Sequence, residues 1–197
     1  MTESLFSEHL EQLLKYTSPD ARDAASRLMA RCTSNTRLAS TDFDEIASVV
    51  GERSARLIKL AYALAERKVT DSFKFGIRHS DEEIIEYFKA KFYTQSHETS
   101  FVMLFDEEDK VIGCEFIAEG TVNFISVPPR RVLEIAIKKK ANSVIIAHNH
   151  PGGVAKPSCE DIDATRLIAS LFETSGRRLR AHYIFAGNDH DVIIPSF

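Results

Sequence analysis

The chain has 197 residues, of which 44% are hydrophobic and 27% are charged, and its formal net charge is -4 at pH 7. A chain of this length can bury enough apolar surface to fold without disulfides or a structural metal. It has no apolar run close to the ~20 residues of a membrane span, and its first residues are acidic and amphipathic, unlike a signal peptide. Its three irregularly spaced cysteines fit neither a disulfide framework nor a paired-cysteine zinc site. We therefore expect a cytoplasmic globular protein with no membrane partner.

The negative net charge lies in the second part of the chain, and the first part is close to neutral. Residues 1–79 contain 12 Lys and Arg against 11 Asp and Glu, and residues 80–197 contain 13 against 18. Neither part has the excess of positive charge that duplex DNA binding usually requires. The counts leave a nucleic-acid partner weakly supported.

The first part of the chain has the pattern of short helices. A helix start is marked by Ser18 followed by Pro19, since proline is favoured at the first helical position. A stretch without a clear period, containing Gly76, predicts a linker within residues 69–79. Helices are expected over residues 3–16, 18–32, 40–50 and 55–68. We therefore assign residues 1–79 to a small all-helical module with its linker.

The pattern changes at residue 80. Ser80 with Glu83 three residues later predicts a capping box at the start of a helix. Short β-branched and aromatic runs then alternate with further helices, which predicts an α/β fold. Strands are expected over residues 99–106, 111–119, 121–127, 142–148, 179–187 and 191–195, and helices over 128–141 and 158–176. Residues 80–197 should thus form one domain, a mixed β-sheet covered by helices.

A cluster of polar residues follows the fourth of these strands, in the segment VIIAHNHPGGVAKPSCEDID. A catalytic zinc needs three protein ligands and one open position. Two residues apart at a strand end, His148 and His150 leave the same face of that strand. Ser158 begins the next helix and places Asp161 in its first turn, where its carboxylate can point back at the imidazoles. The sequence therefore predicts a metal site formed by His148, His150 and Asp161.

Hydrolysis at such a site also requires a group that moves protons. Glu115 lies within the apolar strand GCEFIA, where a buried carboxylate would need a polar partner. We take it as the candidate acid/base, and Ser158 as the candidate donor to a developing oxyanion. Each residue also has a simpler interpretation. A chance H-x-H pair is about a one-in-four event in such a chain, S-x-x-D is also a helix cap, and Glu115 could be an exposed edge residue.

The segment HNHPGGVAKPSCED, residues 148–161, resembles the H-x-H-P-x-G and S-x-x-D pattern of the JAMM (JAB/MPN) metalloproteases. More closely, CEFIAEGTVN, PPRRVLEIAIKKKANSVIIAHNHP and RLRAHYIFAG look like the RadC-type DNA repair protein family. The resemblance covers residues 80–197. The helical module is similar only loosely to that family's helical region, whose helix-hairpin-helix usually has two glycines where this chain has only Gly51.

This resemblance implies a JAB/MPN, deaminase-like fold and cleavage of peptide or isopeptide bonds by a metal-activated water. It implies Zn²⁺ held by His148, His150 and Asp161, with Glu115 as acid/base and Ser158 as oxyanion support. The substrate would be a peptide or a protein conjugate.

The chain departs from the resembled pattern in three places. Asn149 stands where JAMM deubiquitinases usually have Ser or Thr, Gly152 replaces a small hydroxyl residue, and Ala181 precedes His182 where RadC-type proteins commonly have Asp. The last departure puts a supporting role of the residue pair 181–182 in doubt. On its own, His182 is expected to be a structural strand histidine.

Two other functions compete with hydrolysis. The chain could be a DNA-associated repair factor that binds DNA through its N-terminal helices and has a structural or nuclease metal site. A deaminase would instead require H-x-E followed later by P-C-x-x-C, and the sequence lacks this combination. The amphipathic N-terminal helices also allow a homodimer.

Overall fold

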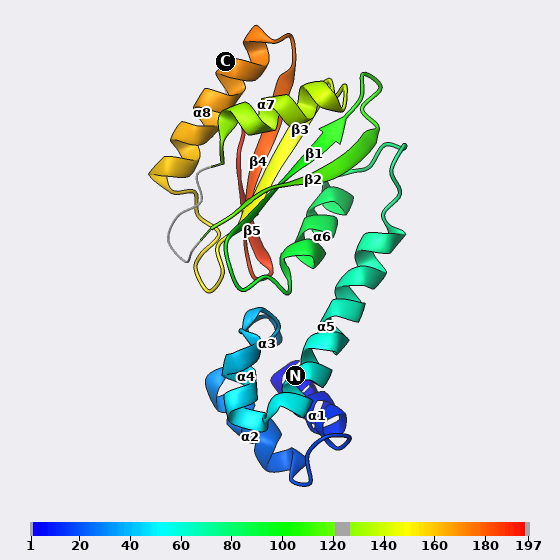
Figure 1. Ribbon diagram of the computed structural model, residues 1–197, viewed down its shortest axis with the longest axis vertical. Helices are drawn as coiled ribbons and strands as arrows, with labels where there is room; N and C mark the ends of the chain where they lie inside the picture. Colours follow the sequence, from blue (N-terminus) through cyan, green and yellow to red (C-terminus); the bar gives the residue numbers. More distant parts are fainter. Residues whose placement is uncertain (1, 121–126, 196–197) are drawn as a thin grey trace.

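The computed structural model describes residues 2–120 and 127–195. Figure 1 shows two parts: a group of helices that contains the N-terminus, and a β-sheet with its own helices. The first part consists of α1 (Thr2–Leu14), α2 (Ala21–Arg31), α3 (Asn35–Ser40), α4 (Phe43–Val50) and α5 (Glu52–Ser72). The far end of α5 runs toward the sheet and contacts α6.

Helix ends in the first part differ from the predicted ones for local reasons. Helix α2 begins after Asp20 and not after Ser18, because the Asp20 carboxylate accepts a hydrogen bond from the amide of Asp23. The short helix α3, which periodicity did not predict, is capped by the side chain of Ser34. Helix α5 continues through Ser72 into the predicted linker. These helices pack around a separate hydrophobic core, which includes Leu14, Leu28, Leu38, Ile46 and Ile58.

The second part is a five-stranded sheet with the order β2-β1-β3-β4-β5. Its strands are β1 (Thr99–Phe105), β2 (Val111–Glu119), β3 (Ser143–Asn149), β4 (Arg178–Ala186) and β5 (Asp189–Ile193). Only β3 and β4 pair in parallel, and the other neighbouring strands are antiparallel. This confirms the predicted mixed sheet of an α/β fold. Most of the strand expected over residues 121–127 lies outside the described residues.

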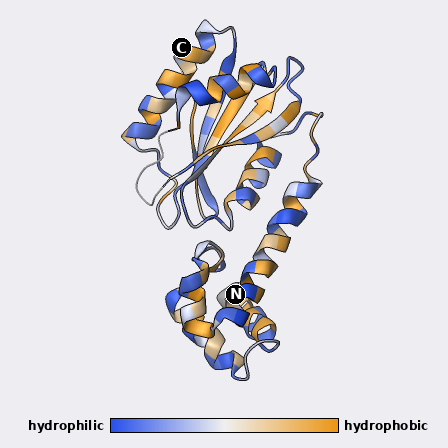
Figure 2. Ribbon diagram, in the orientation of Figure 1, coloured by the Kyte–Doolittle hydropathy of each residue, from blue (hydrophilic) through white to orange (hydrophobic). Residues whose placement is uncertain are grey.

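Helices cover both faces of the sheet. On one face α6 (Asp81–Phe92) packs Phe88 and Phe92 against side chains of β1, β3 and β4. On the other face lie α7 (Pro129–Lys138) and α8 (Cys159–Thr174). Strand β3 is buried along its whole length, which explains its continuous apolar run. Figure 2 shows the hydrophobic residues gathered on the central strands.

The topology brings several segments to one edge of the sheet. Strand β3 ends at this edge, and α8 begins a short turn later, because a parallel β3–β4 pair requires a crossover helix. Strand β1 is antiparallel to β3, with Ser100 opposite His148, so β1 starts where β3 ends. Among the described residues, no helix combines the length and apolar character needed to cross a membrane.

Candidate metal centre

The three residues predicted as ligands converge at this edge. The Nε2 atom of His148 lies 2.9 Å from Nε2 of His150 and 3.2 Å from Oδ1 of Asp161. The Nε2 atom of His150 lies 3.6 Å from Oδ2 of Asp161. Ligands bound to a tetrahedral ion with metal bonds of about 2.0–2.1 Å are separated by roughly 3.3 Å. The observed spacings therefore fit one metal ion, and these residues form a group that could hold it.

A hydrogen bond to the backbone sets the tautomer of His150. Its Nδ1 atom lies 3.1 Å from the carbonyl oxygen of Val154, which can only accept a proton. The proton of a neutral His150 therefore belongs on Nδ1, and the Nε2 lone pair faces His148 and Asp161. Gly152, at φ +69°, lets the chain reverse between His150 and Val154.

A buried chain of hydrogen bonds sets the tautomer of His148 in the same way. The hydroxyl of Thr165 donates to the carbonyl oxygen of Asp161 at 2.6 Å, so it must accept from Nδ1 of His182, also at 2.6 Å. The Nε2 atom of His182 is then an acceptor, and Nδ1–H of His148 donates a hydrogen bond to it at 2.9 Å. This leaves the Nε2 lone pair of His148 directed at His150 and Asp161. Support of this kind orients ligand histidines in metal sites.

The two imidazoles thus direct lone pairs at one point beside a carboxylate. Burial lowers the pKa of His148 to about 4, so this ring is neutral near pH 7. Burial acts to raise the pKa of Asp161, but this pKa lies well below the usual range, and hydrogen bonds from the hydroxyl and the backbone amide of Ser158 help to lower it. Opposed lone pairs and an ionised carboxylate are an arrangement that a cation stabilises.

Ser158 has the capping role and also lies next to the group. Its side chain accepts from the amide of Asp161, and its hydroxyl donates to Oδ2 of Asp161 at 2.7 Å. The backbone amide of Ser158 donates to the same oxygen at 2.8 Å. The capping box predicted as the structural interpretation of S-x-x-D is therefore present, and it fixes the Asp161 carboxylate against the imidazoles.

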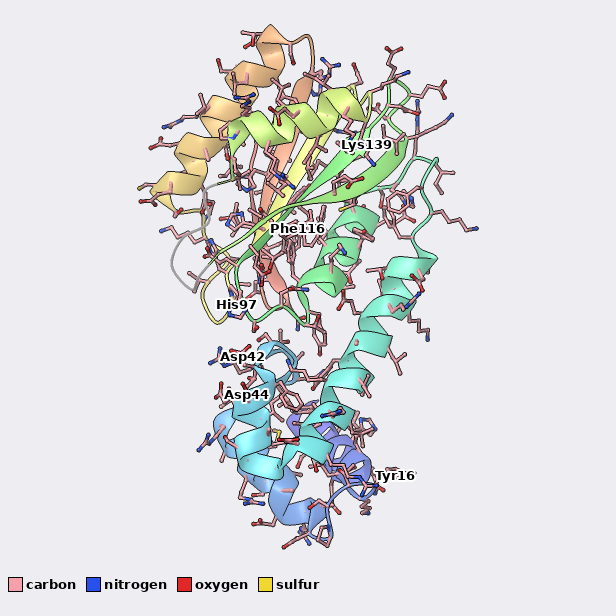
Figure 3. The ribbon with its side chains drawn as sticks, viewed as in Figure 1. Tyr16, Asp42, Asp44, His97, Phe116 and Lys139 are labelled. Atoms are coloured by element: carbon pink, nitrogen blue, oxygen red, sulfur yellow. The ribbon has the colours of Figure 1, made fainter. Side chains whose placement is uncertain are left out.

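The structure does not bring Glu115 to this group. Glu115 lies opposite Val102, and Val102 lies opposite Ile146, which places Glu115 two strands away from β3 and level with the middle of that strand. Its carboxylate forms a salt bridge with Lys139 after α7. Figure 3 shows Lys139 toward the opposite end of the sheet from His97, which precedes β1 beside the metal group. The sequence required a polar partner for the Glu115 carboxylate, and in the structure that partner is Lys139.

A different carboxylate, Glu98, lies at the group. Its Oε1 atom is 4.0 Å from Nε2 of His150, and its side chain is 15% exposed. The side chain of Asn149 fixes the backbone on both sides of Glu98, because it accepts from the amide of Thr99 and donates to the carbonyl of His97. One feature of the sequence pointed to this residue. Glu98 directly precedes β1, and burial of the apolar strand β3 requires a neighbouring strand such as β1.

The comparisons with known proteins agree with the domain's fold. The model of the RadC-like JAB domain family matches residues 78–193 of the chain. The chain belongs to the RadC-like JAB domain family.

Curated relatives of this RadC-like JAB protein are identical to it at about a third of the aligned positions. A UPF0758 protein of Finegoldia magna is 34% identical over 132 residues, which are 67% of this chain and 58% of that relative. UPF0758 proteins of Cupriavidus pinatubonensis and Pelobacter propionicus are each 31% identical and align with 87% and 88% of the chain, or 76% and 78% of their own lengths. The last two similarities extend beyond the matched domain into the helical part.

In this RadC-like JAB protein, His182 is neither exposed nor an ordinary core residue, because both of its nitrogens lie in the hydrogen-bonded chain. Its neighbour Ala181 packs on the other face of the sheet, in the core under α6. An acidic residue at position 181 would therefore point away from the metal group. The supporting partner of His182 is Thr165.

We expect replacement of His182 by Ala to lower the affinity for Zn²⁺ by roughly 10- to 100-fold, because His148 would lose the acceptor that fixes its tautomer. Competition with a chromophoric chelator measures this affinity. His182→Gln, which offers an oxygen acceptor, should recover part of it. His190→Ala on β5 is a matched control that should bind zinc as the wild type does, and unchanged affinity in His182→Ala would contradict the assignment.

Proposed function

We propose that this RadC-like JAB protein is a zinc-dependent hydrolase that cleaves a peptide or isopeptide bond. The convergence of two imidazole lone pairs and the Asp161 carboxylate on one point carries this proposal. Three protein ligands with one open position are typical of catalytic zinc, whereas structural zinc sites have four protein ligands. Mixed imidazole and carboxylate donors suit zinc among the common divalent ions.

A zinc ion held by these residues would lower the pKa of a water molecule and polarise the carbonyl of the scissile amide. Glu98 supports the proposal because its carboxylate lies beside the group and its side chain is partly shielded from solvent. We assign to it the acid/base role that the sequence assigned to Glu115: it takes the proton of the water and delivers it to the departing amine.

Ser158 is suited to donate to an oxyanion. Its hydroxyl proton is directed at Asp161, but the Ser158 amide already donates to the same carboxylate oxygen. When the hydroxyl turns toward a substrate, Asp161 therefore keeps a donor. This arrangement lets one serine support both the ligand and the reaction.

Cleavage of defined amides tests the proposal. Purified protein with one equivalent of Zn²⁺ is incubated with fluorescence-quenched peptides and with peptides joined through a lysine side-chain amine. We expect cleavage that a chelator abolishes and added Zn²⁺ restores, because the ligands are protein side chains that release and rebind the ion. Cleavage that survives chelation, or that His150→Ala retains in full, would contradict the proposal.

A further inference from the structure

Resting on the proposed hydrolase function, we propose that Arg37 of the helical module and the turn after His150 form a subsite for a carboxylate-bearing residue of the peptide substrate. The subsite is a cavity of about 190 Å³ where α3, the end of α6 and the turns after β3 and β4 meet. His150, a member of the metal group, lines this cavity. A ligand in it would therefore contact a residue of the metal group.

The charge of the lining selects an anion. No Asp or Glu is among the residues that line the cavity, and Arg37 is the one side chain among them with a permanent charge. Within residues 2–120 and 127–195, the Arg37 guanidinium forms no ion pair. Guanidinium binds carboxylates through two parallel hydrogen bonds, which makes a carboxylate a well-matched ligand.

The cavity has room for about one residue of a ligand. At about 30 Å³ per water molecule, the volume corresponds to roughly six waters, or about one amino-acid residue. Phe92 and Phe185 line it beside the polar groups, so the aliphatic part of a residue also finds apolar contacts. The substrate residue that binds in this cavity would therefore have either a C-terminal α-carboxylate or an acidic side chain.

Contacts between the two parts of the chain hold the start of α3, the helix that carries Arg37, against the sheet domain. Asn35 donates to the hydroxyl of Tyr93 after α6 at 2.6 Å and accepts from the hydroxyl of Tyr62 on α5. The rings of Tyr62 and Tyr93 also pack edge to face, with centroids 5.6 Å apart. These contacts fix the start of α3 against the sheet domain, two residues before Arg37.

Gly152 lies directly against the guanidinium of Arg37. A Cβ atom at position 152 would lie 2.6 Å from Nη1 of Arg37, and the φ of +69° favours glycine there. A side chain at this position would strain the turn and displace the guanidinium. The positive φ by itself favours glycine at 152, where the resembled pattern has a small hydroxyl residue.

Peptide specificity tests the subsite on the full-length zinc-loaded protein. Three quenched hexapeptides of otherwise identical sequence are compared: one with a free C-terminal carboxylate, one with a C-terminal amide, and one amide that contains a single Glu. We expect the wild type to cleave one or both carboxylate-bearing peptides with kcat/KM on the order of 10- to 100-fold above the neutral amide. Which of the two is preferred identifies the source of the carboxylate.

The variants make the test specific to Arg37. Arg37→Ala should remove the preference, so that its kcat/KM values for the three peptides become equal to one another. Arg37→Glu should reverse the preference in favour of a fourth peptide, an amide that contains a single Lys. Arg31→Ala, at the end of α2 and outside the cavity lining, is the matched control and should keep the wild-type preference. Equal preference in wild type and Arg37→Ala would overturn the inference.

Binding to the metal-free protein separates this inference from the proposed function. Fluorescence anisotropy with the same peptides, carrying a single fluorophore, measures binding without turnover. If no peptide is cleaved but carboxylate-dependent binding disappears in Arg37→Ala, the hydrolase assignment fails and the subsite stands. If peptides are cleaved but binding is the same with and without a carboxylate, the subsite is wrong and the hydrolase stands.

Discussion

Replacing Glu98 with Gln is expected to leave zinc bound and to lower kcat by about 10²- to 10⁴-fold, the usual contribution of a positioned acid/base. The amide has almost the same shape as the carboxylate but cannot take a proton from water. Glu98 is not among the three residues whose donor atoms converge, so the metal group should remain intact. Steady-state kinetics and elemental analysis of the same preparation measure both effects.

Glu115→Gln is the matched control, since it makes the same chemical change in the same part of the chain, on β2. Glu115 is paired with Lys139 and its side chain is 38% exposed, so losing this surface ion pair should cost about 0–1 kcal/mol of stability. We expect its kcat to equal that of the wild type. The reverse result, an inactive Glu115→Gln with an active Glu98→Gln, would restore Glu115 to the role that the sequence suggested.

The second large effect concerns the metal itself. His150→Ala should reduce zinc content from about one ion per chain to near zero, because the remaining two ligands cannot complete a site that normally requires three. His150 is half-buried and its ring is held by the carbonyl of Val154, so its removal leaves the sheet core untouched. Elemental analysis after dialysis gives the zinc content, and circular dichroism verifies that the variant is folded.

Asp161→Asn separates the metal from the helix cap. Asparagine can still accept from the Ser158 amide, so the start of α8 should persist, whereas a neutral amide is a much poorer zinc ligand. We expect zinc loss with little change in thermal stability measured on the metal-free proteins. Full zinc occupancy in both His150→Ala and Asp161→Asn would show that the ion binds elsewhere.

Much of the site could be predicted from the sequence because it is local. His148, His150 and Asp161 lie within one strand, turn and helix start, and the Ser158 cap aims the carboxylate back at the strand. The capping boxes at Ser80 and Ser158 and the buried run of β3 follow from short-range hydrogen bonding and periodicity.

Only the tertiary structure decided which distant residues join this segment. Strand pairing places Glu98 beside His150, and it places Glu115 beside Lys139, away from the metal group. The parallel β3–β4 pair brings His182 into hydrogen-bonding distance of His148. Arg37 reaches the same edge through the packing of α3 against the sheet domain. Sequence motifs describe contacts a few residues apart, whereas the choice between two carboxylates depends on strand order and register, which are set by burial of the whole sheet.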